Sequence, residues 1–308
     1  MNSLPVLYGR LFQIRDPDKD NRVKSLIPDL LFNIGGFMSK TLYVSDLDGT
    51  LLNSESRVSE YTGRMLNRMI SEGLTFTYAT ARSFSTAQKV CETIKVPIPV
   101  IVYNGCAIVE NGTGRLISNE KFSTEESEYI MWKLLNNGLS PLVYAYIDGI
   151  EKVSFDEHDV NCGMRVYLES RAGDKRLNPV LKDQVYSGEI FYYTIIGENA
   201  RLKPLFNEFS KDQRYNATLQ QDMGNAWWLE IMPKKATKAA AICKLKKILG
   251  CDRIVSFGDS INDIPMFEIS DECYSVENSV EKLKVMSTEV IGKNTDDAVI
   301  QKIMEKFY

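Results

Sequence analysis

The chain has 308 residues, of which 44% are hydrophobic and 25% are charged, and its formal net charge is -4 at pH 7. This composition is typical of a globular protein and excludes a disordered chain. It also lacks the basic balance of a nucleic-acid-binding surface, so we expect no nucleic-acid partner. The length exceeds what a single hydrophobic core usually fills, which indicates two domains.

The cysteine and histidine residues give no sign of disulfides, zinc sites or histidine-based catalysis. Six cysteines are scattered without a C-x-x-C pair, which indicates reduced thiols in a cytoplasmic protein. The single histidine, His158, lies in an acidic stretch and is expected to be solvated. The apolar stretch 25–37 is too short to cross a bilayer and contains Pro28 and Asp29. We therefore expect no membrane association and no signal peptide.

The first third of the chain shows a charged leader followed by alternating strands and helices. Residues 1–38 have no convincing periodicity, and we expect them to be a dispensable extension. The next elements are predicted as strand 41–46, helix 59–72, strand 74–80, helix 83–94 and strand 99–105. Strands that alternate with helices indicate a parallel α/β sheet with right-handed crossovers.

The pattern changes after a hairpin predicted around Asn111 and Gly112. Ser123 and Glu126 form a capping box that begins a helix ending near residue 137. The remaining elements of this part are a hairpin that turns at Asp148 and Gly149, helices 159–171 and 199–209, and strands 189–197, 215–220 and 226–232. Residues 120–233 are therefore predicted to form a separate α+β module.

The α/β alternation resumes after this module. Thr237 is the expected N-cap of helix 237–249, and Gly250 is its expected end. The later elements are predicted as strand 253–257, strand 273–276, helix 279–286, strand 288–291 and helix 296–307. We therefore predict a discontinuous core domain, residues 39–119 and 234–308, interrupted by the module.

Two acidic motifs directly follow predicted strands of this core. Asp46 and Asp48 are two positions apart, so on an extended backbone their side chains share a face. Asp259 and Asp263 follow strand 253–257 in the same way, and ligands of open α/β sheets bind at the carboxyl ends of the strands. Four converging carboxylates would raise one another's pKa values unless a hard divalent cation lay between them. The sequence predicts a magnesium site with a phosphorylated ligand.

Thr80 and Lys238 extend this pattern. Thr80 ends a strand and offers a hydroxyl to a phosphate group, and Lys238 offers a positive charge at a helix N-terminus, which itself favours anions. Each of these features alone has an ordinary structural explanation, and a D-x-D-G stretch can be a plain turn after a strand.

The order of the motifs resembles the haloacid dehalogenase-like hydrolase superfamily. The Cof-like branch is indicated by "DLDGTLL", "ATAR", "YNGCAIV", "LEIMPKKATKAAAI" and "FGDSINDIPMF", and the resemblance covers residues 39–308. It implies an α/β fold, with a Rossmann-like parallel-sheet core and an inserted C2-type cap domain, and a subfamily IIB phosphatase activity. The module lies between Thr80 and Lys238, where a C2 cap belongs.

The resemblance also implies roles for the acidic residues. Asp46 is expected to attack phosphorus and form an aspartyl-phosphate, and Asp48 is expected to act as general acid and then general base. Asp46, Asp259 and the main-chain carbonyl of Asp48 would bind Mg²⁺, with Asp263 as a direct ligand or one acting through water.

The phosphate group would be held by the side chains of Thr80, Lys238 and Asn262 and by the amides of Leu47 and Ala81. Ala81 replaces a glycine of the usual motif, and Lys235 and Ala239 replace glycines near Lys238. No reacting group is lost by these departures.

Substrate identity is less defined by the sequence. We expect a small phosphorylated metabolite: in the first place a sugar or sugar-alcohol phosphate, and in the second a phosphorylated cofactor such as flavin or pyridoxal phosphate. We also expect a monomer or homodimer. The candidate substrate contacts in the cap are Tyr144, Tyr146, Arg165, Trp227 and Trp228. Two alternatives stay open: a sugar phosphomutase that uses the same aspartyl-phosphate, and a non-catalytic module that binds phosphorylated ligands.

Overall fold

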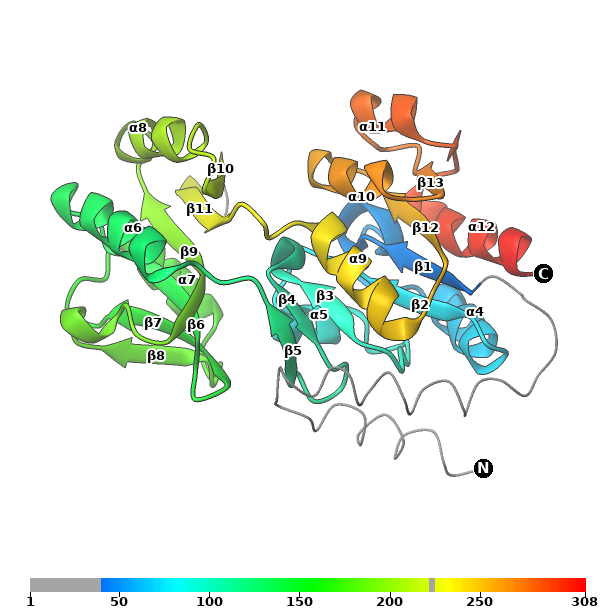
Figure 1. Cartoon of the computed structure of the whole chain (residues 1–308), viewed down its shortest axis with the longest axis horizontal. Coiled ribbons are helices and arrows are strands. Elements are labelled where there is room, and N and C mark those ends of the chain that lie inside the picture. Colours follow the sequence, from blue (N-terminus) through cyan, green and yellow to red (C-terminus); the bar gives the residue numbers. More distant parts are fainter. Residues whose placement is uncertain (1–39, 222–224) are drawn as a thin grey trace.

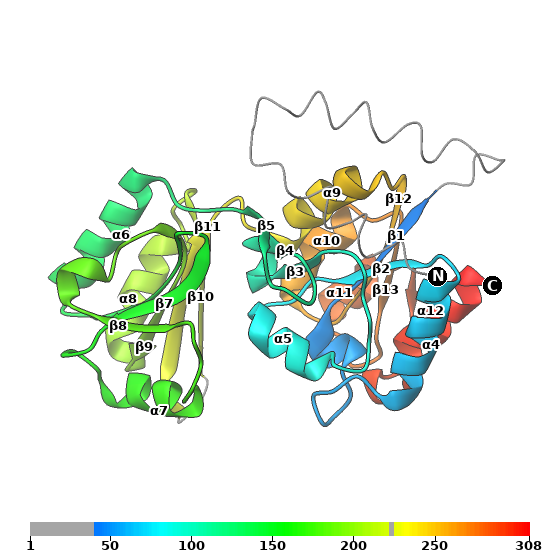
Figure 2. The same cartoon turned by 90° about the horizontal axis from the view of Figure 1, so that it is seen from below.

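A computed structural model describes residues 40–221 and 225–308 of the chain. These residues form two lobes, which lie side by side in both views of Figures 1 and 2. Residues 120–123 lead from the first lobe into the second, and residues 234–237 lead back. The predicted extension 1–38 lies outside the described residues, and its dispensability stays a prediction. Among the described residues, no helix is long and apolar enough to cross a membrane.

A parallel sheet forms the centre of the core lobe. It consists of β1 (Thr41–Ser45), β2 (Thr75–Tyr78), β12 (Arg253–Gly258), β13 (Glu272–Ser275) and β14 (Glu289–Val290), in the order β14-β13-β12-β1-β2. β1 lies between β2 and β12, and Leu42 and Val44 on it are fully buried. Strands covered on both faces need such continuous apolar runs. The predicted Rossmann-like α/β core is confirmed.

Helices cover both faces of this sheet (Figures 1 and 2). α4 (Glu60–Ser71) and α12 (Ala298–Phe307) pack together on one face, and α9 (Lys238–Leu249) and α10 (Ile264–Glu268) on the other. α5 (Phe84–Val90) and α11 (Glu281–Met286) are further short helices of the lobe. Thr237 accepts a hydrogen bond from the Ala240 amide as the N-cap of α9, and Gly250 ends that helix at a φ of 62°.

A small antiparallel sheet extends the core lobe beside β2. It consists of β3 (Val100–Val102), β4 (Ala107–Val109) and β5 (Leu116–Asn119). The prediction of one strand over 99–105 is wrong beyond Val102, because the chain turns at Tyr103, Asn104 and Gly105, all with positive φ. This turn lies against the start of α9, since a Cβ on Gly105 would be 2.1 Å from the Thr237 carbonyl oxygen.

The inserted cap has one mixed sheet, in the order β10-β11-β9-β6-β7-β8. Its strands are β6 (Leu142–Ile147), β7 (Ile150–Asp156), β8 (Leu177–Val180), β9 (Glu189–Gly197), β10 (Tyr215–Gln221) and β11 (Trp227–Pro233), and its helices are α6 (Thr124–Asn136), α7 (Cys162–Ser170) and α8 (Asn199–Phe209). The inserted α+β cap is therefore confirmed, and its exact bounds of 120 and 233 stay a prediction. β8 was not predicted, because a four-residue edge strand that contains Pro179 gives almost no periodic signal.

The two faces of the cap sheet have different partners. Val143 and Ala145 lie in the apolar cluster that also holds residues of α6 and α8. Tyr144 and Tyr146 lie in the cluster that continues into the core lobe, as the alternation along β6 predicts. The cap therefore presents an aromatic face toward the core.

We expect Gly105→Ala to destabilise the protein by at least about 3 kcal/mol, because the new methyl group would overlap the Thr237 carbonyl and strain a residue at a φ of 97°. Gly112→Ala is the matched control, since Gly112 has a φ of 95° but a Cβ added there would meet nothing within 4 Å. It should cost about 1 kcal/mol. Urea unfolding of both variants measures the difference, and equal losses would contradict the contact with α9.

Candidate active site

Lys238 joins two carboxylates at the carboxyl end of the parallel sheet. Its Nζ lies 2.5 Å from Asp46 Oδ1 and 2.7 Å from Asp263 Oδ1, and the Lys238 side chain has no solvent exposure. Asp46 directly follows β1, Asp263 lies in the turn after β12, and Lys238 is the first residue of α9. The site is thus assembled from three elements that are distant in the sequence.

The turn after β12 holds Asp263 and Asp259 in fixed positions. Asp263 Oδ2 accepts hydrogen bonds from the amides of Asp259 and Ser260, at 3.0 and 3.1 Å. Asp259 Oδ1 accepts a hydrogen bond of 2.9 Å from the Thr50 hydroxyl. Asp263 therefore accepts hydrogen bonds from three donors, Lys238 and the two amides. Asp259 lies beside Asp46 and Asp263 and accepts a hydrogen bond from one donor, the Thr50 hydroxyl.

Glycine permits the close approach of the two acidic loops. Gly49 has a φ of 77°, and a Cβ there would lie 2.5 Å from Asp259 Oδ2. A side chain at this position would push Asp259 away from the strand end that carries Asp46. The glycine of "DLDGT" is required both for the turn and for the acidic group.

The buried charges of the group do not balance. Burial raises the pKa of Asp46 well above its usual value, Lys238 partly offsets this rise, and Asp263 adds to it. Burial, with the charge of Asp263, raises the pKa of Asp259 to about 6 even though the Thr50 hydrogen bond lowers it. Burial would lower the pKa of Lys238, but Asp263 and Asp46 raise it overall. Three carboxylates thus share one ammonium group.

The donor set fits a hard divalent cation. Asp46, Asp259 and Asp263 each offer a carboxylate oxygen, and these oxygens lie within 4.8 Å of one another. Mg²⁺ prefers oxygen ligands with few protein carboxylates, and it would neutralise the excess negative charge. The acidic group could therefore bind a metal, as the sequence predicts.

Asp48 lies outside the buried group and pairs with an arginine. Arg82 Nε and Nη2 donate to the two Asp48 carboxylate oxygens at 2.7 and 2.6 Å. The hydrogen bond to Asp48 raises the pKa of Arg82, and the Asp48 side chain is 49% exposed. Asp46 and Asp48 therefore have different surroundings, one buried beside an ammonium group and the other open toward the cap.

The predicted phosphate-binding residues surround the same strand ends. Thr80 follows β2, is fully buried, and its hydroxyl accepts a hydrogen bond from the Arg82 amide at 3.1 Å. Asn262 donates to Asn104 Oδ1 at 3.1 Å and accepts from Ser260. The predicted amides of Leu47 and Ala81 come one residue after Asp46 and Thr80, respectively. Their roles stay a prediction.

Three further residues of the site were not assigned from the sequence. These are Arg82, which holds Asp48, Asn104, which holds Asn262, and Thr50, which holds Asp259. Each lies within a motif at the end of a core strand, next to a residue that was assigned or close to one. Their positions in the motifs could have marked these residues as members of the site. Their hydrogen-bond partners could not be predicted, because each partner comes from another loop and is brought close only by the fold.

A cavity of about 580 Å³ begins at Asp48 and extends between the two lobes. The core contributes Asp48, Ala81, Arg82, Ser83, Thr86 and Tyr103, and the cap contributes Tyr144, Tyr167, Arg171, Arg176, Tyr192, Gln220, Trp228 and Glu230. Cavities of this size suit small-molecule ligands. The volume and its position beside Asp48 indicate the place of the substrate.

Two of the five cap residues considered as substrate contacts line this cavity, Tyr144 and Trp228. Trp227 points to the other face of the cap sheet, because neighbours on a strand alternate. Tyr146 is buried against Phe191, with ring centroids 5.2 Å apart, and Arg165 is exposed on α7, outside this lining.

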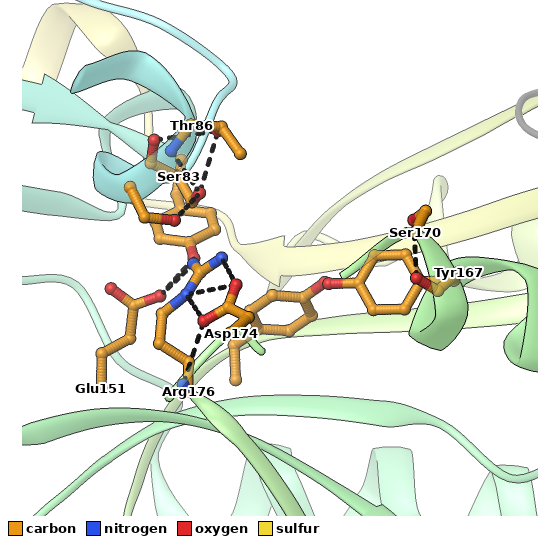
Figure 3. Close-up of polar contacts among 10 residues, drawn as sticks. Ser83, Thr86, Glu151, Tyr167, Ser170, Asp174 and Arg176 are labelled. Carbon is orange, nitrogen blue, oxygen red and sulfur yellow. Dashed lines mark hydrogen bonds and ion pairs between the residues drawn. The ribbon is translucent and has the colours of Figure 1, made fainter. Parts of the chain in front are cut away.

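Tyr103 connects the core lobe to the cap beside the cavity. Its hydroxyl donates to Glu151 Oε1 and accepts from Arg176 Nη1 at 2.7 Å. Figure 3 shows the Arg176 guanidinium between Glu151 and Asp174. Arg176 is thus engaged by two carboxylates of the cap. These contacts hold the cap in its position over the core.

We expect Mg²⁺ to raise the melting temperature more at about pH 7.5 than at about pH 5. The pKa of Asp259 is about 6 in the folded protein against an ordinary 3.8, so folding without metal takes up a proton between these values. The metal-free protein therefore loses stability as the pH rises through this window, and Mg²⁺ competes with that proton.

Thermal unfolding at both pH values, with and without millimolar Mg²⁺, measures this dependence. Asp259→Asn should remove most of the Mg²⁺ effect, whereas Asp212→Asn, in a cap ion pair with Arg214, should retain it. An equal Mg²⁺ effect at the two pH values would show that the acidic group is not the metal site.

The comparisons with known proteins agree with this geometry. Residues 43–303 match the family model of the haloacid dehalogenase-like hydrolases. A 5-amino-6-(5-phospho-D-ribitylamino)uracil phosphatase of Bacillus subtilis is 26% identical over 272 residues, covering 82% of this chain and 93% of that protein. A solved structure from Thermotoga maritima has a TM-score of 0.71 and 27% identity, covering 87% of this chain and 97% of that one.

A sugar phosphatase of HAD subclass IIB shares the fold, with a TM-score of 0.63 and 17% identity, covering 87% of this chain and 99% of that one. The family match covers both acidic motifs and the inserted cap. The chain therefore belongs to the haloacid dehalogenase-like hydrolases, in the Cof-like subfamily IIB, and is a phosphatase of small phosphorylated metabolites.

Proposed function

We propose that this protein hydrolyses small phosphate monoesters in a Mg²⁺-dependent reaction through a phosphorylated Asp46. The observation that carries the proposal is the different environment of the two aspartates. Asp46 is 5% exposed and bonded to Lys238, whereas Asp48 faces the cavity in which a leaving group would lie. Asp46 is therefore suited to act as a fixed nucleophile, and Asp48 is suited to donate and accept protons.

In the first step, an Asp46 carboxylate oxygen attacks phosphorus, and the bond from phosphorus to the ester oxygen breaks. Asp48 gives its proton to that oxygen, so the product leaves as a neutral alcohol. Arg82 holds the Asp48 carboxylate by two hydrogen bonds, and this pair must loosen when Asp48 carries the proton. Arg82 also lines the cavity, so a substrate that enters it would contact Arg82 and could displace it from Asp48.

In the second step, water attacks the phosphorus of the aspartyl-phosphate. Asp48, now a carboxylate, takes the proton of the water, the bond between Asp46 and phosphorus breaks, and inorganic phosphate is released. The Asp48 proton is thereby restored, and one water is consumed per ester. Asp48 can serve as both acid and base because it lies outside the buried group of Asp46, Asp259, Asp263 and Lys238 and can exchange a proton with the solvent-filled cavity.

Lys238, Thr80 and Asn262 would hold the phosphoryl oxygens in both steps. Lys238 is fixed by two carboxylates and needs no reorganisation to face developing negative charge. When bound, Mg²⁺ supplies charge neutralisation between the phosphate and the carboxylates. Asp263 already accepts from Lys238 and two amides, so we assign it chiefly the role of positioning Lys238 and Asp259. Asp46, Asp259 and the Asp48 carbonyl would then hold the metal, with one Asp263 acceptor site left for a direct or water-mediated contact.

The physiological substrate is a small phosphorylated metabolite, and two groups are supported by the relatives. Three Bacillus subtilis relatives act, by their names, on a ribityl phosphate that carries a uracil ring, and a structural neighbour is a sugar phosphatase. Sugar phosphates therefore stay within the proposal. A cytoplasmic location and a monomer or homodimer complete it.

We expect Asp46→Asn to abolish Mg²⁺-dependent phosphate release from p-nitrophenyl phosphate and sugar phosphates. Asp48→Asn should lower steady-state turnover by about 10²–10⁴-fold. With p-nitrophenyl phosphate, whose leaving group needs little protonation, Asp48→Asn should still release about one equivalent of p-nitrophenol in a burst. Stopped-flow absorbance measures the burst, and mass spectrometry after acid quench locates the phosphoryl group on Asp46.

The other outcomes separate the alternatives. Phosphorylation of Asp46 without release of phosphate, relieved by a sugar bisphosphate, would indicate the phosphomutase. Binding of phosphorylated ligands without phosphorylation of wild-type Asp46 would indicate a non-catalytic module. Full activity of Asp46→Asn would refute the assigned nucleophile.

A further inference from the structure

Two side-chain amides meet beyond the carboxyl ends of β3 and β12. Asn262 Nδ2 donates to Asn104 Oδ1 at 3.1 Å, and Asn262 Oδ1 accepts from the Ser260 hydroxyl. Asn262 is exposed in the turn after β12, and the terminal torsion of an asparagine has a broad preference of its own. The orientation of the Asn262 amide therefore depends on these two contacts.

The two partners of Asn262 differ in their selectivity. A hydroxyl can donate or accept, so Ser260 can pair with either end of the Asn262 amide. Asn104 Oδ1 can only accept, so it pairs with the N–H end alone. A half-turn of the Asn262 amide would place two carbonyl oxygens against each other. Asn104 is therefore the contact that selects the orientation of Asn262.

This orientation matters for the proposed role of Asn262 as a ligand of the phosphoryl oxygens. These oxygens only accept hydrogen bonds, so Asn262 must face them with an N–H group. A side-chain amide carries two N–H groups, and one of them can donate to Asn104 while the other donates to a phosphoryl oxygen. A reversed amide would face the phosphate with its carbonyl oxygen, whose partial negative charge is repelled. Asn104 thus prepares Asn262 before the substrate binds.

The turn that carries Asn104 is held in a strained conformation. Tyr103 and Asn104 have φ values of 52° and 54°, in the left-handed region that few non-glycine residues adopt. The Asn104 amide donates to the Thr80 carbonyl at 2.9 Å, and the Tyr103 amide donates to the Arg82 carbonyl at 3.0 Å. Strained residues persist where their surroundings fix them, and they gather at functional sites. The Asn104 side chain thus has a fixed support between Thr80 and Asn262.

We propose that Asn104 is a positioning residue of the phosphate site, which holds the Asn262 amide with an N–H group toward the phosphoryl oxygens. The inference rests on the proposed phosphatase function and adds to it a residue that acts through Asn262. Without Asn104, the phosphate itself would have to order the Asn262 side chain, at an entropic cost. The loss at Asn104 should therefore be smaller than the loss at Asn262, and it should vanish in a protein that lacks the Asn262 amide.

The test measures the Kd of inorganic phosphate in the presence of Mg²⁺, by thermal-shift titration. Asn104→Gly removes the side chain and keeps the left-handed backbone accessible, so the fold should be retained. This variant should raise the Kd about fivefold, as expected for the ordering of one side chain. Asn262→Ala should raise it at least about tenfold, because a hydrogen bond to a charged group is lost. Asn104→Gly added to Asn262→Ala should change the Kd by less than about twofold.

Asp148→Gly is the matched control, because Asp148 also has a left-handed φ, of 51°, but lies in the hairpin between β6 and β7 of the cap. It should leave the Kd of phosphate unchanged. An unchanged Kd in Asn104→Gly would overturn the positioning role. So would a fivefold loss that persists in the Asn262→Ala background, since Asn104 would then act on the phosphate or the fold without Asn262.

Steady-state kinetics with p-nitrophenyl phosphate separate this inference from the proposed function. The kcat/KM of Asn104→Gly should fall by about the same factor as the phosphate Kd rises. Failure of the wild type to hydrolyse any phosphate ester would refute the proposed function. The phosphate Kd is measured without turnover, so the coupling of Asn104 with Asn262 would still be present or absent in that case.

Discussion

The buried contact of Lys238 with Asp46 and Asp263 is the constraint on which the rest of the site depends. It joins the end of β1, the turn after β12 and the start of α9, and it lies where no water screens the charges. Removing either partner would leave an unpaired buried charge, which usually costs several kcal/mol. The group is tolerable because Asp263 also receives two backbone amides and because the remaining negative charge suits a cation.

The N-terminus of α9, which carries Lys238, also helps to position the inserted cap on the core. The chain returns from β11 through residues 234–237 directly into α9, and the Tyr103–Gly105 turn packs against Thr237 at that point. The Tyr103 ring then lies 5.7 Å from the Tyr144 ring of the cap, and its hydroxyl bonds to Glu151 and Arg176. One turn of the core thus contacts both the helix that carries Lys238 and the wall of the cavity.

Much of the fold could be predicted because its signals are local. Strand β9 and helix α8 have the predicted bounds, and the Ser123 capping box and the Asp148–Gly149 hairpin follow from residue type and spacing. The proposed catalytic residues could be located because each follows a core strand or begins a helix, and the resemblance of their motifs to the hydrolase superfamily implied their roles. The ion pair of Asp48 with Arg82 could not, since it depends on how two loops meet across the sheet edge. The short β8 and the early end of β3 were missed because the first has little periodicity and the second ends at a turn with positive φ.

The different surroundings of Asp46 and Asp48 follow from the turn that the chain makes over Leu47–Leu51, directly after β1. Asp46 closes the strand and is drawn under the sheet edge beside Lys238, while Asp48 follows the turn residue Leu47 and emerges toward the cap. A carboxylate among buried like charges would bind its proton too tightly to release it on each turnover. A carboxylate half exposed beside an arginine can lose and regain one. The two-residue spacing thereby places two chemically different carboxylates at one strand end, and the cavity with its aromatic wall lies on the side of Asp48, the proposed proton donor.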